Sequence, residues 1–119
     1  MTSPLKIAIA GLGTVGAGTL KLLDEQAELL ALRAGRRLQV TAVSARNRNL
    51  DRGVQISGFQ WFDDAVEMAR SADADVVVEL IGGSDGAALA VCETAFESGR
   101  HVVTANKALL AHHGTDLAA

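Results

Sequence analysis

The sequence predicts an α/β fold: a doubly wound domain in which a mostly parallel sheet is covered by helices on both faces. Two observations support this prediction. Short apolar runs alternate along the chain with longer segments in which apolar residues recur at helical spacing. The strand-like runs are apolar throughout, as in parallel strands that are buried on both faces. The length of 119 residues fits one domain with a single hydrophobic core.

The first half of the chain contains three predicted strands and one long helix. The helix ends in a basic segment with a glycine, Arg33 to Arg37, as the negative pole at a helix C-terminus favours. The third strand is brief and follows a polar stretch. In chain order we expect a strand at 5–10, a helix from Thr14 to about Leu32, a strand at 38–45, a loop or one short helical turn at 46–58, and a strand at 59–62.

The second half repeats the alternation of strands and helices. Asp63-Asp64 can cap a helix, because a carboxylate accepts hydrogen bonds from the first N–H groups of a helix. Val76-Val77-Val78 form the centre of the clearest strand in the chain. In chain order we expect a helix to about Arg70, a strand at 75–81, a helix from Ser84 to about Ser98 with Gly99 as its stop, a strand at 101–104, and a helix beginning near Asn106.

Composition excludes several other classes of protein. Hydrophobic residues make up 49% of the chain and charged residues 21%, which is typical of a soluble globular protein. No apolar run approaches the ~20 residues of a membrane span, and the N-terminus lacks the basic segment of a secretory signal. We therefore expect a cytoplasmic protein. The net charge of −3 gives no basic surface for nucleic acid, and the single cysteine, Cys92, excludes a disulfide scaffold.

Residues 11–16, Gly-Leu-Gly-Thr-Val-Gly, match the pattern G-x-G-x-x-G. They follow a predicted strand and open a predicted helix, the context in which this pattern indicates a Rossmann-type dinucleotide site. Gly11 allows the tight turn, Gly13 lets a pyrophosphate approach the backbone, and Gly16 lets helix and strand pack closely. The helix N-terminus then offers N–H groups and a partial positive charge to the phosphates. The alternative is a glycine-rich turn that binds nothing.

The residues after the second predicted strand bear on the choice of cofactor. NAD-binding domains carry an Asp or Glu there, which accepts hydrogen bonds from the ribose. This sequence instead reads Ser-Ala-Arg-Asn-Arg at residues 44–48, and a guanidinium binds a 2′-phosphate through charge-assisted hydrogen bonds. We therefore expect NADP(H), with Arg46 as the first candidate ligand and Arg48 as the second, and leave NAD use open. Solvated loop arginines are the alternative.

Three further residues fall at the predicted carboxyl edge of the sheet or next to it. Gly82 follows a strand, where it either lets the nicotinamide lie against the backbone or simply makes a turn. Lys107 follows the last strand, where an ammonium can stabilise the charge on a carbonyl oxygen or deliver a proton; a solvated lysine is the alternative. Glu79 lies in an apolar strand, which is costly unless the carboxylate is paired. The sequence leaves it open whether Glu79 is a structural ion-pair partner or a site acid.

Other reactive side chains are assigned to packing. Cys92 lies on an apolar helical stretch, His101 begins a strand, and Trp61 is interpreted as a packing anchor. His112 and His113 are adjacent in sequence rather than on one face of a helix, so no metal site is predicted.

Together these motifs resemble the amino-terminal domain of homoserine dehydrogenase. The resemblance rests on residues 11–16, on Val-Glu-Leu-Ile-Gly-Gly at 78–83 and on His-Val-Val-Thr-Ala-Asn-Lys-Ala-Leu-Leu-Ala at 101–111, and it covers essentially the whole chain. It implies NAD(P)-dependent interconversion of L-homoserine and L-aspartate 4-semialdehyde, a step towards threonine, methionine and isoleucine. It also implies an active-site position for Lys107, a 2′-phosphate contact for Arg46, and cofactor contacts at Leu12, Gly13, Thr14, Val15, Ile81, Gly82 and Thr104.

Family members continue into a domain that binds the substrate and forms dimers. The sequence ends at Ala119 inside a predicted helix, so we expect residues 1–119 to be a cofactor-binding fragment that is inactive alone and belongs to a homo-oligomeric enzyme. Two alternatives stay open. An oxidoreductase of the glucose–fructose type would carry Glu-Lys-Pro where this sequence has Asn106-Lys107-Ala108. A non-catalytic NAD(P)-sensing module would have no use for Lys107.

Overall fold

The structure is a five-stranded parallel sheet with helices packed against it. The computed structural model describes residues 3–45, 58–81 and 86–104. The strands lie in the order β3-β2-β1-β4-β5, and every neighbouring pair is parallel, which confirms the predicted α/β fold. In chain order the elements are β1 (Leu5–Ala10), α1 (Thr14–Glu25), α2 (Ala27–Ala34), β2 (Leu38–Ser44), β3 (Gln60–Phe62), α3 (Ala65–Ser71), β4 (Val76–Glu79), α4 (Ala87–Glu97) and β5 (His101–Thr104).

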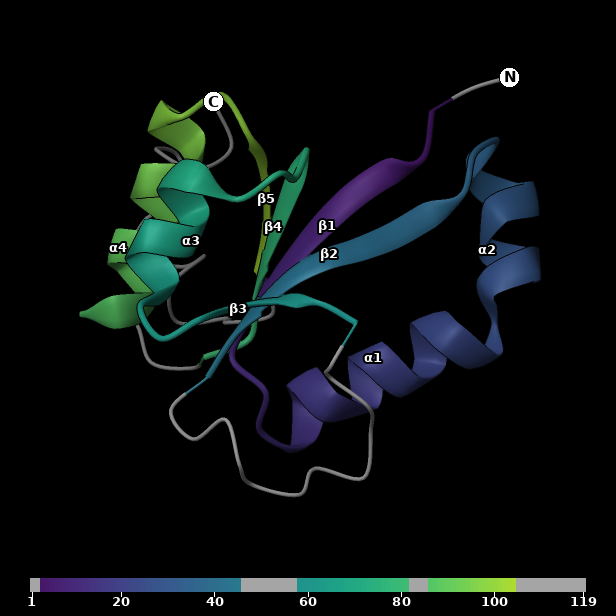
Figure 1. The fold of residues 1–119 in the computed structure, drawn as a ribbon, viewed down its shortest axis with the longest axis horizontal. Helices are drawn as coiled ribbons and strands as arrows, with labels where there is room; N and C mark the ends of the chain where they lie inside the picture. The colour runs from purple at the N-terminus through teal and green to yellow at the C-terminus, as the bar shows by residue number, and fades with distance from the viewer. Residues whose placement is uncertain (1–2, 46–57, 82–85, 105–119) are drawn as a thin grey trace.

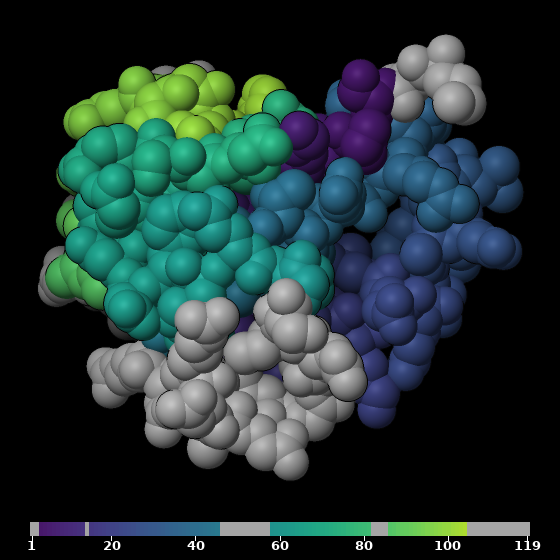
Figure 2. Space-filling view, in the orientation of Figure 1, coloured from purple at the N-terminus to yellow at the C-terminus, as the bar shows by residue number. Residues whose placement is uncertain are grey.

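The helices divide between the two faces of the sheet. Figure 1 shows α1 and α2 on one side and α3 and α4 on the other. The same two groups of helices stand apart in the space-filling view (Figure 2). The strand order reverses next to β1, because the chain runs outward through β2 and β3 before α3 leads it back to β4. In doubly wound sheets, ligands bind at the carboxyl ends of the strands beside such a switch point.

The predicted strands are present, with differences at both ends of β4. β1 and β5 have the predicted bounds, and β2 and β3 lie within their predicted ranges. β4 begins at Val76 rather than at residue 75 and ends at Glu79 rather than at Ile81. The N–H of Leu80 still donates to the carbonyl oxygen of Ala10 at 2.8 Å, but the N–H of Ile81 donates to the side chain of Glu79. The sheet therefore ends where a side chain replaces the neighbouring strand as the acceptor.

The single helix predicted from Thr14 to about Leu32 is wrong: the structure has two helices, α1 and α2. They meet at Gln26, whose φ of −108° and ψ of 19° leave the helical region. Hydrogen bonds continue across the break, from the N–H of Gln26 to the oxygen of Leu22 and from the N–H of Leu30 to the oxygen of Gln26. Because the apolar residues keep helical spacing through this point, the sequence pattern does not reveal the break.

Several predicted helix ends are confirmed. Asp64 caps α3 by accepting a hydrogen bond at 2.9 Å from a backbone N–H in the first turn. Gly35 and Gly99 follow α2 and α4 with φ of 77° and 80°, the left-handed region that ends many helices. The start of α4 is described from Ala87. Outside the described residues lie the predicted start of this helix at Ser84, most of the predicted loop at 46–58, and the predicted helix near Asn106.

The core lies on both faces of the sheet, because successive strand residues point to opposite faces. One buried cluster packs against α3 and α4, and the other against α1. The first includes Ala8, Ala10, Met68, Val77 and Val91, and the second includes Ile7, Ile9, Leu12, Leu20 and Val43.

Two of the three side chains assigned to packing are confirmed in that role. Cys92 is fully buried, and its burial together with the charge of Glu79 raises its pKa to about 12. Trp61 is half-buried against the second cluster and donates its Nε1 hydrogen to Asp63 at 2.8 Å. His101 is exposed, so the prediction that it packs is wrong. The reason is that β5 is an edge strand whose alternate residues face solvent.

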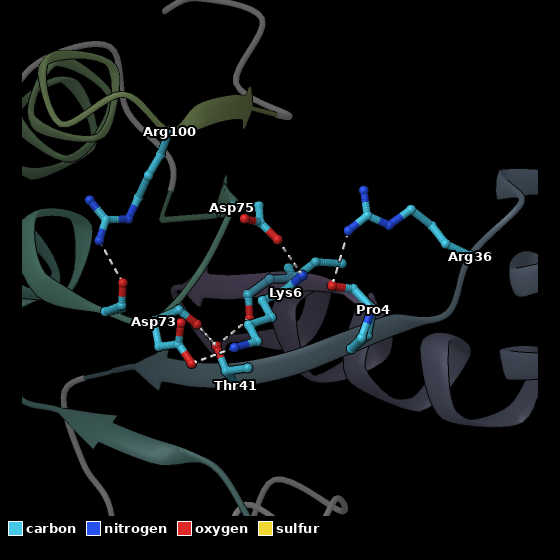
Figure 3. A network of polar contacts seen from close by, with 9 residues as sticks. Pro4, Lys6, Arg36, Thr41, Asp73, Asp75 and Arg100 are labelled. Atoms are coloured by element: carbon cyan, nitrogen blue, oxygen red, sulfur yellow. Dashed lines mark hydrogen bonds and ion pairs between the residues drawn. The ribbon is translucent and has the colours of Figure 1, made fainter. Parts of the chain in front are cut away.

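Polar side chains tie together the amino ends of the strands (Figure 3). Lys6 donates from its backbone N–H to Asp75 at 3.0 Å and from Nζ to Asp73 at 2.8 Å. Thr41 Oγ1 donates to the carbonyl oxygen of Asp73 at 2.7 Å. The guanidinium of Arg100 donates to two carbonyl oxygens at the end of α3, at 3.1 and 2.5 Å. These bonds fix the edge of the sheet that lies opposite the glycine turn.

Candidate dinucleotide site

A cavity of about 660 Å³ opens at the carboxyl edge of the sheet, beside the switch point. Its volume lies within the range of about 300–1,000 Å³ that is usual for small-molecule sites. Its walls come from the β1–α1 turn, the end of β2, the start of α3 and the segment that follows β4. The described residues that line it are Gly11, Leu12, Gly13, Ser44, Ala45, Asp63, Asp64, Ala65, Val66, Leu80, Ile81 and Ala87.

Gly11 makes the turn from β1 into this cavity. Its φ of 97° lies in the region that favours glycine, and a Cβ there would come within 2.9 Å of the carbonyl carbon of Leu80. Its N–H donates to the oxygen of Ser44 at 2.8 Å. The turn is therefore held between the ends of β2 and β4, and only glycine fits it.

Gly16 allows α1 to pack directly against the same turn. A Cβ at this position would lie 2.0 Å from the carbonyl oxygen of Gly11, a distance that no side chain tolerates. This contact is the close packing of helix and strand that the sequence predicts for the third glycine of the pattern. A larger residue at position 16 would displace α1 from the turn.

Packing within the described part of the chain does not require glycine at position 13. Its φ of −72° is open to any residue, and a Cβ there would meet no atom of the described residues within 4 Å. Gly13 also lines the cavity and stands directly before α1. The space beside this backbone is therefore open on the side from which the predicted pyrophosphate would approach.

The N-terminus of α1 has the properties of an anion site. The first intrahelical bond runs from the N–H of Ala17 to the oxygen of Gly13, at 2.9 Å, so the N–H groups of the first turn have no intrahelical acceptor. In the part of the chain that the structure describes, no side chain caps this end, and no acidic residue lies in the first turn. The partial positive charge of the helix is therefore not neutralised from within α1.

The structure places some of the predicted site residues and leaves others outside. Gly11, Leu12, Gly13 and Ile81 line the cavity. Val15 is exposed on the first turn of α1, and Gly16 is buried beneath the glycine turn. Thr104 ends β5 next to Glu79 and is not among the described lining residues. Thr14 begins α1. Arg46, Arg48, Gly82 and Lys107 lie outside the described residues.

Two carboxylates on the wall of the cavity are not predicted as site residues. Asp63 and Asp64 are exposed and follow β3, which lies beside β2. Asp64 caps α3, and Asp63 accepts from the indole of Trp61. The sequence identifies the cap, but the signal for the site is the strand order, because the residues that follow two adjacent parallel strands share one edge.

Glu79 is fully buried at the end of β4. Its Oε2 accepts from the backbone N–H of Ile81 at 2.5 Å, and its Oε1 accepts from Thr104 Oγ1 at 2.6 Å. Each oxygen of this carboxylate thus has a donor, which is what a buried carboxylate needs. The Glu79 side chain therefore connects the end of β4 to the end of β5 at the carboxyl edge of the sheet.

The described residues hold neither a metal-binding cluster nor a membrane-spanning helix. The three described ranges hold no group of three or more His, Cys, Asp or Glu residues able to bind a metal ion. In the same ranges, no helix is both long enough and apolar enough to cross a membrane.

The fold, the glycine turn and the open helix N-terminus define a dinucleotide-binding domain of the Rossmann type. A sequence profile described as "Homoserine dehydrogenase, NAD binding domain" matches residues 11–119. The chain therefore belongs to the family of homoserine dehydrogenase NAD-binding domains, and the predicted resemblance is confirmed.

Individual relatives agree with this assignment. Homoserine dehydrogenase of Pseudomonas aeruginosa is 47% identical over 116 residues, which cover 96% of this chain and 26% of the relative. The enzyme of Methylobacillus glycogenes is 44% identical over 108 residues, which cover 91% of this chain and 26% of the relative. The crystal structure of the homoserine dehydrogenase from Thiobacillus denitrificans superposes with a TM-score of 0.85 at 36% identity, covering 97% of this chain and 26% of that one. The chain thus spans about a quarter of the length of these relatives.

Proposed function

We propose that this chain binds NADP(H) as the cofactor-binding part of a homoserine dehydrogenase. The observation that carries the proposal is Gly13, which stands open at the N-terminus of α1 and on the wall of a cavity of about 660 Å³. Gly11 and Gly16 are explained by packing within the chain, whereas a ligand that approaches the backbone explains Gly13.

The parts of a dinucleotide would lie along the cavity in a definite order. The backbone N–H groups at the start of α1 would hold the pyrophosphate. The adenosine half would lie towards the ends of β2 and β3, beside Ser44 and Ala45, and the nicotinamide half towards β4 and β5, beside Leu80 and Ile81. The bound cofactor supplies or accepts the hydride.

The preference for NADP(H) rests on charge at the adenosine end. Arg46 and, second, Arg48 follow β2 closely in sequence and would contact the 2′-phosphate. Asp63 and Asp64 stand on the same wall, where a free carboxylate would repel that phosphate and favour NAD. Both carboxylates accept hydrogen bonds within the chain, which occupies part of their acceptor capacity, whereas the arginines bring positive charge and paired N–H donors to a phosphate. We therefore assign the discrimination between the two cofactors to the arginines.

Lys107 is the residue we assign to the chemistry. It follows the carboxyl end of β5 closely in sequence, and that edge of the sheet faces the switch point. An ammonium there would stabilise negative charge on the carbonyl oxygen of L-aspartate 4-semialdehyde, or give that oxygen a proton. In the reverse direction the neutral amine of Lys107 would accept the proton of the homoserine hydroxyl and become the ammonium.

We further infer that the 119 residues do not turn over substrate alone, since they span about a quarter of the relatives' length. The complete protein would be a cytoplasmic homo-oligomer that serves threonine, methionine and isoleucine synthesis. The family assignment does not favour an oxidoreductase of the glucose–fructose type. A non-catalytic sensing module is the competing function, and a variant of Lys107 separates it from the enzyme.

A direct test is the titration of the chain with NADPH and, separately, with NADH, followed by nicotinamide fluorescence. We expect saturable binding of both nucleotides, tighter for NADPH. Equal affinities would remove the NADP(H) preference but leave a dinucleotide site. If neither nucleotide binds, the proposed function is wrong.

A further inference from the structure

Glu79 is a buried carboxylate to which the proposed function gives no role. It is fully buried in the last position of β4, and Ser44 is the other polar residue among the buried ones described. A carboxylate in such a place is costly unless both oxygens are hydrogen-bonded. An apolar residue would avoid this cost, so packing alone does not explain why a carboxylate occupies this position.

The contacts of Glu79 join two separate segments of the chain. Oε2 accepts from the N–H of Ile81, in the segment that leaves β4, and Oε1 accepts from the hydroxyl of Thr104, the last residue of β5. Glu79 and Thr104 are also partners in the parallel register of the two strands. One side chain thus ties the carboxyl ends of β4 and β5 to each other.

The bond to Ile81 also decides where the chain leaves the sheet. The N–H of Leu80 still donates to β1, at Ala10, whereas the next N–H donates to the Glu79 carboxylate. Ile81 then lines the cavity. The position of this part of the cavity wall is therefore set by the carboxylate rather than by the neighbouring strand.

We propose that Glu79 is a positioning residue for the nicotinamide half of the cofactor. By holding the Ile81 backbone and the Thr104 hydroxyl in place, it fixes the edge formed by β4 and β5 against which that half lies. The adenosine half, on the β2 and β3 side of the switch point, does not depend on it. This inference rests on the proposed function.

The test compares two ligands that share the adenosine half. NADPH occupies both halves of the site, whereas 2′-phosphoadenosine 5′-phosphate occupies the adenosine half alone. Two variants break the tie: Glu79→Leu removes both acceptors, and Thr104→Val removes one donor while keeping the shape of the side chain. Two conservative variants keep the contacts. Glu79→Gln can still accept from Ile81 and donate to Thr104, and Thr104→Ser keeps the hydroxyl.

For Glu79→Leu and Thr104→Val we expect the Kd for NADPH to rise at least about tenfold, because buried donors or acceptors lose their partners at the cofactor edge. The Kd for 2′-phosphoadenosine 5′-phosphate should stay within about twofold of the parent, because the adenosine half does not contact β4 and β5. Glu79→Gln and the control Glu93→Gln, an exposed glutamate on α4, should leave both Kd values near those of the parent. Thr104→Ser, which keeps the hydroxyl, should bind NADPH more tightly than Thr104→Val.

The outcomes separate this inference from the proposed function. If the parent binds neither ligand, the proposed function is wrong and the inference falls with it. If the parent binds both, the inference alone is overturned by an unchanged NADPH affinity in Thr104→Val, or by equal losses for the two ligands. Should circular dichroism show Glu79→Leu to be unfolded, Thr104→Val decides, since it removes a single hydroxyl group and keeps the shape of the side chain.

Discussion

Gly16 packs so tightly on Gly11 that a Cβ at position 16 would lie 2.0 Å from the Gly11 carbonyl oxygen. Gly11 is itself held by its N–H bond to Ser44 and has no room for a side chain beside Leu80. The first helix, the turn and the ends of two strands therefore form one rigid unit. The cavity wall and the start of α1 take their positions from this unit.

Gly16→Ala should destabilise the fold. The added methyl group must displace either the turn or the helix, and overpacking of this kind costs about 1–3 kcal/mol. Gly18→Ala is the matched control, because Gly18 lies on the same helix and a Cβ there meets nothing within 4 Å; it should stabilise by about 0.5–1 kcal/mol. Urea unfolding measures both, and similar stabilities of the two variants would contradict the close packing of Gly16 on Gly11.

Gly13→Ala should separate folding from binding. The position is open, so we expect the free energy of unfolding to change by less than about 1 kcal/mol, the cost of an alanine at the helix cap. NADPH and NADH should both bind at least about tenfold more weakly, because the methyl group occupies the approach of the pyrophosphate. Fluorescence titration beside Gly18→Ala checks this. Unchanged affinity would mean that no phosphate lies against residue 13.

The parts of the fold that were predicted correctly depend on local signals. β1 and β5 have their predicted bounds because a glycine or a change to polar residues marks their ends, and Asp64 caps α3 as its position before an apolar run suggests. The sequence does not predict the break at Gln26, because helical spacing of apolar residues continues through it.

The candidate site was predicted where one continuous segment makes it, as in residues 11–16. Contacts between distant segments were not predicted. Asp63 reaches the cavity only because β3 lies beside β2, and Glu79 meets Thr104 only because of the register of β4 and β5. Neither relationship has a local pattern in the sequence, since both depend on how strands far apart in the chain are paired.

Arg46→Ala should weaken NADPH binding much more than NADH binding. Loss of charged hydrogen bonds to the 2′-phosphate corresponds to about 1–3 kcal/mol, and NADH has no such phosphate. Arg48→Ala should have a smaller effect. Arg33→Ala, an exposed arginine in the last turn of α2, is the control for the loss of positive charge alone. Equal losses for both cofactors would remove Arg46 from this role.

The thiol of Cys92 should make the protein less stable at high pH. Burial, with the charges of Glu79 and Glu93, raises its pKa to about 12 from an ordinary value of 9.0. Below pH 9 both the folded and the unfolded chain keep the proton, so pH has no effect through this group. Between pH 9 and 12 the unfolded chain loses the proton and the folded chain does not, so stability falls as pH rises.

Cys92→Val keeps an apolar side chain of similar size and removes this titration. Denaturant unfolding at about pH 8 and about pH 10.5 should therefore give a larger loss of stability for the parent than for the variant. The native thiol should also resist thiol reagents at neutral pH, as a buried, protonated group does. Equal losses of stability in parent and variant would show that Cys92 does not contribute.

Lys107→Ala, made in a full-length version that carries the substrate domain, distinguishes an enzyme from a sensing module. Removal of a proton donor or of a charge that stabilises the carbonyl oxygen should lower kcat at least about a hundredfold. The Kd for NADPH should change little by comparison, since the phosphates and the adenosine half bind elsewhere. Lys21→Ala, an exposed lysine on α1, is the control for the loss of one ammonium group. If the variant loses cofactor affinity and rate in the same proportion, Lys107 serves binding alone. If the parent itself shows no homoserine-dependent reduction of NADP, the sensing module is favoured.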